Sequence, residues 1–141
     1  MADPVTLRLY ADILLGNQSW PRGADTATML YFLNLTRDKV YLPAFLKYAK
    51  SDTAARWSNG YSMAVDALAH IAHELPARQR LEALGRDTVK PEYRALVANS
   101  LAAVNSRATR EILRSLSRVG LPPGLQKLVE MRVASPDSVP K

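Results

Sequence analysis

Two apolar patterns with helical spacing recur along the chain at a nearly constant interval, and this repetition limits the fold more than any other feature. The first pattern is shared by the stretches 41–52, 76–87 and 108–119. Leu46 in the first stretch matches Leu81 in the second, and Leu81 matches Leu113 in the third. The same amphipathic segment is therefore used three times.

The second pattern lies between the copies of the first. The stretches 64–71 (AVDALAHI) and 97–104 (VANSLAAV) align with nearly the same interval, and the alignment pairs Leu68 with Leu101. A pair of helices that recurs roughly every 32–35 residues is typical of an α-solenoid, in which each pair buries its apolar face against its neighbours.

Local signals predict the ends of the helices. Asp3 before Pro4 indicates an N-cap followed by a proline in the first helical position, and Gly16 indicates the end of that first helix. Further helices are predicted at 24–35, 40–50, 55–74, 77–85, 91–105, 107–118 and 123–133. No stretch alternates apolar and polar residues between hairpin turns, so a sheet is not expected.

The stretch 91–104 (PEYRALVANSLAAV) carries the most specific motif. Pro-Glu-Tyr-Arg, a face of small and apolar residues, and Ser-Leu-x-x-Val follow one another, and this order resembles the second helix of a HEAT repeat, an armadillo-type helical repeat. Asp87 and Arg94 stand where HEAT-like repeats carry their aspartate and arginine. We predict that this pair links a turn to the following helix. The resemblance covers roughly residues 24–119.

The resemblance implies an all-α fold, namely an α-α superhelix of about three helix pairs with flanking terminal helices. Residues 1–134 are then a single HEAT-like domain and 135–141 a flexible tail. Tyr61 and Thr26 depart from the family pattern, because they occupy positions where an arginine is usual. A tetratricopeptide repeat is less favoured because its Trp, Gly, Tyr and Pro set is not in register. A plain helical bundle is the remaining alternative.

One side of the predicted helix 55–74 carries polar residues in a narrow stripe. At about 100° per residue, that stripe contains Ser62, Asp66, His70 and His73. The resemblance implies that second helices line the concave surface. We therefore predict a partner-binding surface made of Ser62, Asp66, His70, His73, Glu92 and Asn99.

A metal site is a more specific alternative for this stripe, because aspartate and histidine are common zinc ligands. The sequence 70–74 (HIAHE) is neither HExxH nor HxxEH, and the chain has only two histidines. A solvated helix face that contacts a partner is therefore favoured. We expect no metal and no other cofactor.

The net charge of +6, from 19 basic and 13 acidic residues, suits acidic partners such as nucleic acid. Four arginines lie within about 80° of one another on the predicted helix 107–118. This candidate phosphate-binding ridge consists of Arg107, Arg110, Arg114 and Arg118. A polar outer face is the favoured interpretation, because arginine stems also cover apolar surface.

As the resemblance implies, the predicted function is a non-catalytic scaffold that binds a protein partner on a concave helical surface. The alternatives are a nucleic-acid-binding HEAT-like domain related to DNA alkylation repair proteins, and a segment or subunit of a larger repeat assembly. Activity like that of the bilin lyases, which resemble HEAT repeats, lacks support because the chain has no cysteine and no catalytic constellation. Without a signal peptide or membrane span in the sequence, the cytoplasm is the default location.

Overall fold

The computed structural model describes residues 3–23, 25–50, 58–86, 91–116 and 123–133. These ranges form α1 (Pro4–Leu15), α2 (Thr26–Leu35), the 3-10 helix η1 (Lys39–Tyr41), α3 (Leu42–Tyr48), α5 (Ser58–His70), α6 (Leu75–Gly85), α7 (Pro91–Val104), α8 (Arg107–Leu116) and α9 (Pro123–Val133). No strand occurs in the described ranges, and the predicted all-α class is confirmed. No helix among them is both long and apolar enough to cross a bilayer.

Both predicted ends of the first helix are confirmed. The Asp3 carboxylate accepts a hydrogen bond from the Thr6 N–H at 2.8 Å, and Pro4 occupies the first turn. Gly16 adopts a left-handed φ of 87°, and the Asn17 N–H donates to the Asp12 carbonyl at 2.8 Å. A glycine fits this position because it has no β-carbon to clash in the left-handed region.

The helix predicted at 55–74 is shorter in the structure, where α5 ends at His70. Pro76 prevents the helix from continuing through residue 76, because it lacks an N–H for the helical bond to Ala72 and its ring would clash with that carbonyl, but the chain leaves the helix earlier, after His70. The chain instead makes a turn in which the Glu74 N–H donates to the Ile71 carbonyl at 3.0 Å. Pro76 then lies in the first turn of α6.

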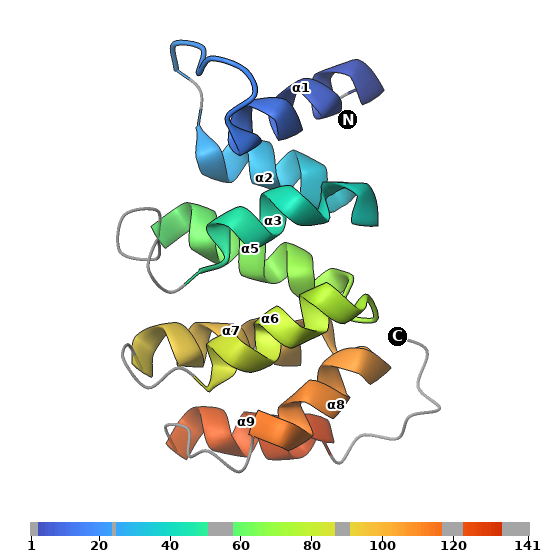
Figure 1. Ribbon diagram of the computed structural model, residues 1–141. Coiled ribbons are helices and arrows are strands. Elements are labelled where there is room, and N and C mark those ends of the chain that lie inside the picture. Colours follow the sequence, from blue (N-terminus) through green and yellow to red (C-terminus); the bar gives the residue numbers. More distant parts are fainter. Residues whose placement is uncertain (1–2, 24, 51–57, 87–90, 117–122, 134–141) are drawn as a thin grey trace.

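The helices stack in chain order from α1 at one end to α8 and α9 at the other (Figure 1). Helices α1, α3, α6 and α8 contact one another in sequence and form a first row, and α2, α5, α7 and α9 form a second row in the same way. Each first-row helix also contacts the second-row helix that follows it in the chain. Helix α5 therefore packs against α2, α3, α6 and α7, and it lies at the centre of the stack.

Most of the leucines matched in the sequence are buried to the same extent. Leu68 in α5 and Leu101 in α7 are both fully buried, as are Leu81 in α6 and Leu113 in α8, whereas Leu46 in α3 is half-buried. Alanines make up much of the buried surface of α5, and their small side chains allow close helix packing.

Basic side chains join successive helices at their carboxyl ends. Lys47 Nζ donates to the Leu14 carbonyl at 2.7 Å, and Arg80 Nη1 donates to the Leu46 and Ala49 carbonyls at 2.8 and 3.1 Å. The last carbonyls of a helix lack intrahelical partners and carry a partial negative charge, so a cation from the neighbouring helix stabilises them. The interval between Lys47 and Arg80 is one period of the repeated pattern.

The N-cap of α2 leads to a prediction about acid stability. The Asp25 carboxylate accepts hydrogen bonds from the Thr28 hydroxyl at 2.7 Å and the Thr28 N–H at 2.9 Å, and these bonds lower the pKa of Asp25 below 3.8. Because the folded state has the lower pKa, the charged cap stabilises the fold above pH 3.8, and that contribution is lost as the pH falls through the lowered pKa.

We expect NMR titration to show the Asp25 carboxyl ionising below pH 3.8. The substitution Asp25→Asn keeps an oxygen for the cap but has no titrating group, so the acid-induced loss of Tm should be smaller in this variant than in the wild type. Asp25→Ala, which removes the cap itself, should lower the Tm at neutral pH as well. Identical Tm profiles for the wild type and Asp25→Asn would contradict the assignment.

Candidate functional site

The polar stripe predicted from the sequence is present on α5. Ser62, Asp66 and His70 follow one another at intervals of four residues, and all three are partly exposed. Most of the residues between them, including Ala64 and Leu68, are buried against the neighbouring helices. These three side chains therefore share the solvent side of the central helix.

Asp66 is fixed by a hydrogen bond from the neighbouring second-row helix. Asn34 in α2 is buried, and its Nδ2 donates to Asp66 Oδ2 at 2.9 Å. A buried amide without a partner destabilises the fold by about 1–3 kcal/mol. The bond therefore fixes both side chains and joins the edges of α2 and α5.

Arg37 supplies the partner for the other end of the Asn34 amide. Its Nη1 donates to Asn34 Oδ1 and to the Asn34 backbone carbonyl, both at 2.8 Å. Arg37 has a left-handed φ of 54°, and this conformation turns the chain just after α2. We call the connected set of Arg37, Asn34, Asp66 and His70 the α2–α5 polar cluster.

His70 completes the cluster with a defined ring orientation. Its Nδ1 lies 2.9 Å from the Asp66 backbone carbonyl and 3.5 Å from Asp66 Oδ2. A carbonyl oxygen only accepts, so this hydrogen bond requires the hydrogen on Nδ1. Nε2 is the other polar atom of the ring, and the side chain keeps a quarter of its surface exposed.

His73 is separated from this cluster. It lies beyond the end of α5, is largely exposed, and its Nε2 is 3.3 Å from Glu74 Oε2. The end of α5 at His70 thus removes the helical relationship on which a site of Asp66, His70 and His73 would depend. Within the described residues no group of three or more His, Cys, Asp or Glu side chains is placed to hold a metal ion.

Ser62, Asp66 and His70 also do not form a nucleophilic triad. A triad requires the histidine to contact the serine hydroxyl directly. Here Ser62 and His70 are eight positions apart, and a helix rises about 1.5 Å per residue, so the two lie about 12 Å apart along the axis. The cluster can donate and accept hydrogen bonds, but this trio does not activate a nucleophile.

An exposed aromatic residue lies on the same helix as Asn34. Tyr31 keeps 48% of its surface exposed, and the Phe32 ring supports it edge-on at a centroid distance of 5.6 Å. Phe32 in turn packs against Tyr10 of α1 at 6.2 Å. Leu35, one turn after Tyr31, is also exposed. The solvent side of α2 therefore has apolar groups close to the polar cluster.

The other two predicted surface residues belong to α7. Asn99 is exposed there, and α7 contacts α5. Glu92 lies in the first turn of α7, but its side chain is outside the described part of the structure. The predicted surface is thus divided between two adjoining second-row helices.

The four arginines of the candidate phosphate ridge are not equivalent. Arg110 is 1% exposed, so its guanidinium is not available to a phosphate, which corrects the ridge predicted from helical spacing. Arg107 and Arg114 are exposed, and Arg118 lies outside the described residues. Glu111 is close to two cations, with distances of 2.9 Å to Arg78 Nη1 and 3.9 Å to Arg107 Nε. This carboxylate weakens the local positive field.

The predicted link between Asp87 and Arg94 stays a prediction, and the structure shows a different bond made by Arg94. Arg94 Nε donates to the Gly85 carbonyl at the end of α6, at 3.1 Å. Asp87, its predicted partner, lies outside the described residues. Gly85 also allows α8 to approach α6, because a β-carbon at this position would be 2.5 Å from Leu116 Cδ1.

Sequence reasoning did not identify Asn34 and Arg37 as members of the site. The signal was available for Asn34, because it is a polar residue in the otherwise apolar segment 29–35 and precedes Asp66 by about one repeat period.

Comparisons of the chain with protein-family models, with curated proteins and with solved structures find no match.

Proposed function

We propose that the chain is a short HEAT-like α-solenoid that acts as a non-catalytic protein-binding scaffold and recognises its partner on the solvent side of the second-row helices. The observation that carries the proposal is the α2–α5 polar cluster. Its side chains are already hydrogen-bonded in one arrangement, so little conformational entropy remains to be lost when a partner binds.

The surroundings of the cluster support a protein partner. Protein interfaces combine a few rigid aromatic anchors with polar groups that satisfy hydrogen bonds. Tyr31 is such an anchor, because it is half exposed and Phe32 holds its ring. Leu35 adds exposed apolar surface next to it.

The charges of the cluster favour a polypeptide over a nucleic acid. Arg37 is a donor, the Asp66 carboxylate is an acceptor, and His70 presents Nε2 as a further polar atom. A polypeptide backbone presents N–H and C=O groups that match such a mixed set. A phosphate backbone would be repelled by the Asp66 carboxylate. The nucleic-acid alternative is further weakened by the burial of Arg110 and by Glu111.

A site-specific photo-crosslinking experiment tests this surface. A photoreactive amino acid with an aromatic ring would replace Tyr31 in α2, Asn99 in α7 or His73 directly after α5, which we call the second-row positions, and Gln79 in α6 or Arg107 in α8 on the first-row side. All five positions are exposed, so the replacements should leave the fold intact. We expect the three second-row positions to capture the same protein from a lysate of the source cells and the two first-row positions not to capture it.

Nuclease treatment of the lysate is the control for nucleic acid, and it should leave the captured protein unchanged. The variant Tyr31→Ala should reduce capture at His73 at least about tenfold, since truncating a central aromatic anchor typically weakens binding by about 2 kcal/mol or more, and about 1.4 kcal/mol is tenfold. Equal capture from both rows, or no capture from the second-row positions, would overturn the proposal. Loss of the captured protein after nuclease treatment would favour the nucleic-acid alternative.

A further inference from the structure

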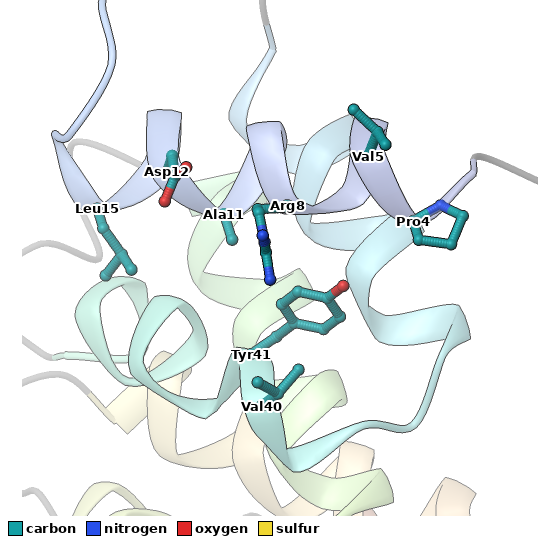
Figure 2. Close-up of a pocket in the computed structure, with 8 residues that line it drawn as sticks. All are labelled: Pro4, Val5, Arg8, Ala11, Asp12, Leu15, Val40 and Tyr41. Carbon is teal, nitrogen blue, oxygen red and sulfur yellow. The ribbon is translucent and has the colours of Figure 1, made fainter.

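The solvent face of α1 carries four residues in a regular order. They are Val5, Arg8, Asp12 and Leu15, and their spacing of three, four and three residues places them within about 80° of one another. Val5 is 79% exposed, and Leu15 is also exposed. They border a groove of about 560 Å³ between α1 and η1, which Val40 and Tyr41 line on the other side (Figure 2).

The order of these residues is self-complementary. From either end of α1 the face reads apolar residue, charged residue, residue of opposite charge, apolar residue. If two copies of α1 lie antiparallel and cross near Tyr10, Arg8 of each copy faces Asp12 of the other, and Val5 faces Leu15. A parallel pair would place Arg8 opposite Arg8 and Asp12 opposite Asp12, and like charges in contact oppose association.

The spacing also matches known helix packing. Intervals of three, four and three residues are those of the a and d positions of a heptad, which two helices bury between them when they cross at about 20°. A charged residue at such a position sets register and orientation at some cost in stability. Helix α1 has 12 residues and is therefore about 18 Å long, enough for all four contact layers.

Both charged groups are available for a partner. Figure 2 shows Arg8 pointing from α1 toward Tyr41, while Asp12 lies one turn further along the helix. In the described part of the chain, the Arg8 guanidinium and the Asp12 carboxylate form no hydrogen bond or ion pair with each other or with other residues. An ion pair between residues four positions apart in a helix is more favourable when the acidic residue comes first. In α1 the basic Arg8 precedes the acidic Asp12, which is the less favourable order for such a pair.

We propose that α1 is a homodimerisation helix, and that a second copy of this chain docks its own α1 antiparallel into the groove between α1 and η1. The contact is isologous, because the same face of both copies is used and each contact occurs twice about a two-fold axis: Arg8 of each copy meets Asp12 of the other, and Val5 meets Leu15. Val40, which is largely exposed, would then be covered by the partner's α1. The interface is at the low end of the size range for specific contacts, so the dimer should depend on concentration. This surface is separate from the second-row surface of the proposed function.

Analytical ultracentrifugation of charge variants tests the proposal. The wild type should show a concentration-dependent monomer–dimer equilibrium. Arg8→Asp gives two acidic residues on the face and Asp12→Arg gives two basic ones, so each variant alone should have a dimer dissociation constant at least about tenfold higher. An equimolar mixture of the two variants should associate again, because each arginine then faces an acidic side chain of the other chain.

Lys127→Asp and Glu130→Arg on α9 are the matched controls, since both residues are exposed and charged. They should self-associate like the wild type. Far-UV circular dichroism checks that the α1 variants keep their helices. A wild type that stays monomeric up to about 1 mM, variants that dimerise unchanged, or a mixture that fails to associate would each overturn the proposal. Photo-crosslinking at Tyr31, His73 and Asn99 should be unaffected by the α1 variants, which separates this proposal from the proposed function.

Discussion

The variant Leu68→Ala is expected to unfold with a free energy about 3–5 kcal/mol below that of the wild type. Leu68 is fully buried in α5, and α5 packs against α2, α3, α6 and α7. The substitution removes apolar contacts and leaves a cavity that helices on several sides prevent from collapsing. A domain of this size has a stability of about 5–15 kcal/mol, so this single change removes a large part of it.

Urea unfolding monitored by circular dichroism measures this loss. Leu75→Ala is the matched control, because it is the same chemical change at a leucine that is 62% exposed at the start of α6. The control should change the free energy of unfolding by no more than about 0.5 kcal/mol. If Leu68→Ala cost less than about 1 kcal/mol, the site would not have the packing that its full burial indicates.

The helix ends were predictable because their signals are local. Asp3 and Pro4 start α1, and Gly16 ends it, through interactions that involve only the neighbouring residues. Pro76 indicates a break between α5 and α6, because a proline cannot donate the helical hydrogen bond, but it does not indicate that α5 ends as early as His70. The apolar periodicity continues past His70, and on its own it predicts a helix that extends to residue 74.

The polar cluster was only partly predictable because it depends on contacts between helices. Helical spacing was sufficient to place Asp66 and His70 on one face of α5. The bond from Asn34 to Asp66 depends on the register between α2 and α5, which no pattern within either helix specifies. The position of the Arg37 side chain depends on the left-handed backbone conformation of Arg37 itself, just after α2. The sequence does not signal that conformation, because the residue is neither a glycine nor an asparagine.

Hydrogen bonds to the carboxyl ends of helices explain part of the excess of basic residues. In the described ranges, Lys47, Arg80, Arg94 and Arg110 each donate to a carbonyl at or just beyond the carboxyl end of another helix: α1, α3, α6 and α7, respectively. Each cation meets the partial negative charge of the helix end. Part of the positive charge is therefore used to hold successive helices together, and the composition alone does not indicate a nucleic-acid partner.

Arg110 shows why helical spacing misassigned a surface residue. Asn105 has a left-handed φ of 53°, which folds α8 back against α7 immediately after the turn. Arg110, in the first turns of α8, consequently faces α7, and its Nη1 donates to the Asn105 carbonyl at 3.2 Å. Spacing of about 100° per residue shows which residues share a face, but not how much of that face the preceding helix covers.

Replacing Arg110 by alanine is therefore expected to lower the free energy of unfolding by about 3 kcal/mol, since it removes a buried stem and leaves the Asn105 carbonyl without its donor. Arg107→Ala on the same helix, at a side chain that is 77% exposed, should change it by no more than about 0.5 kcal/mol. Arg110→Met keeps most of the stem without the guanidinium, so its loss of unfolding free energy should lie between those of Arg107→Ala and Arg110→Ala. The difference in unfolding free energy between Arg110→Met and Arg110→Ala, measured by urea unfolding, gives the contribution of the buried stem. Equal effects of Arg107→Ala and Arg110→Ala would contradict the burial of Arg110 and would return it to the candidate phosphate-binding ridge.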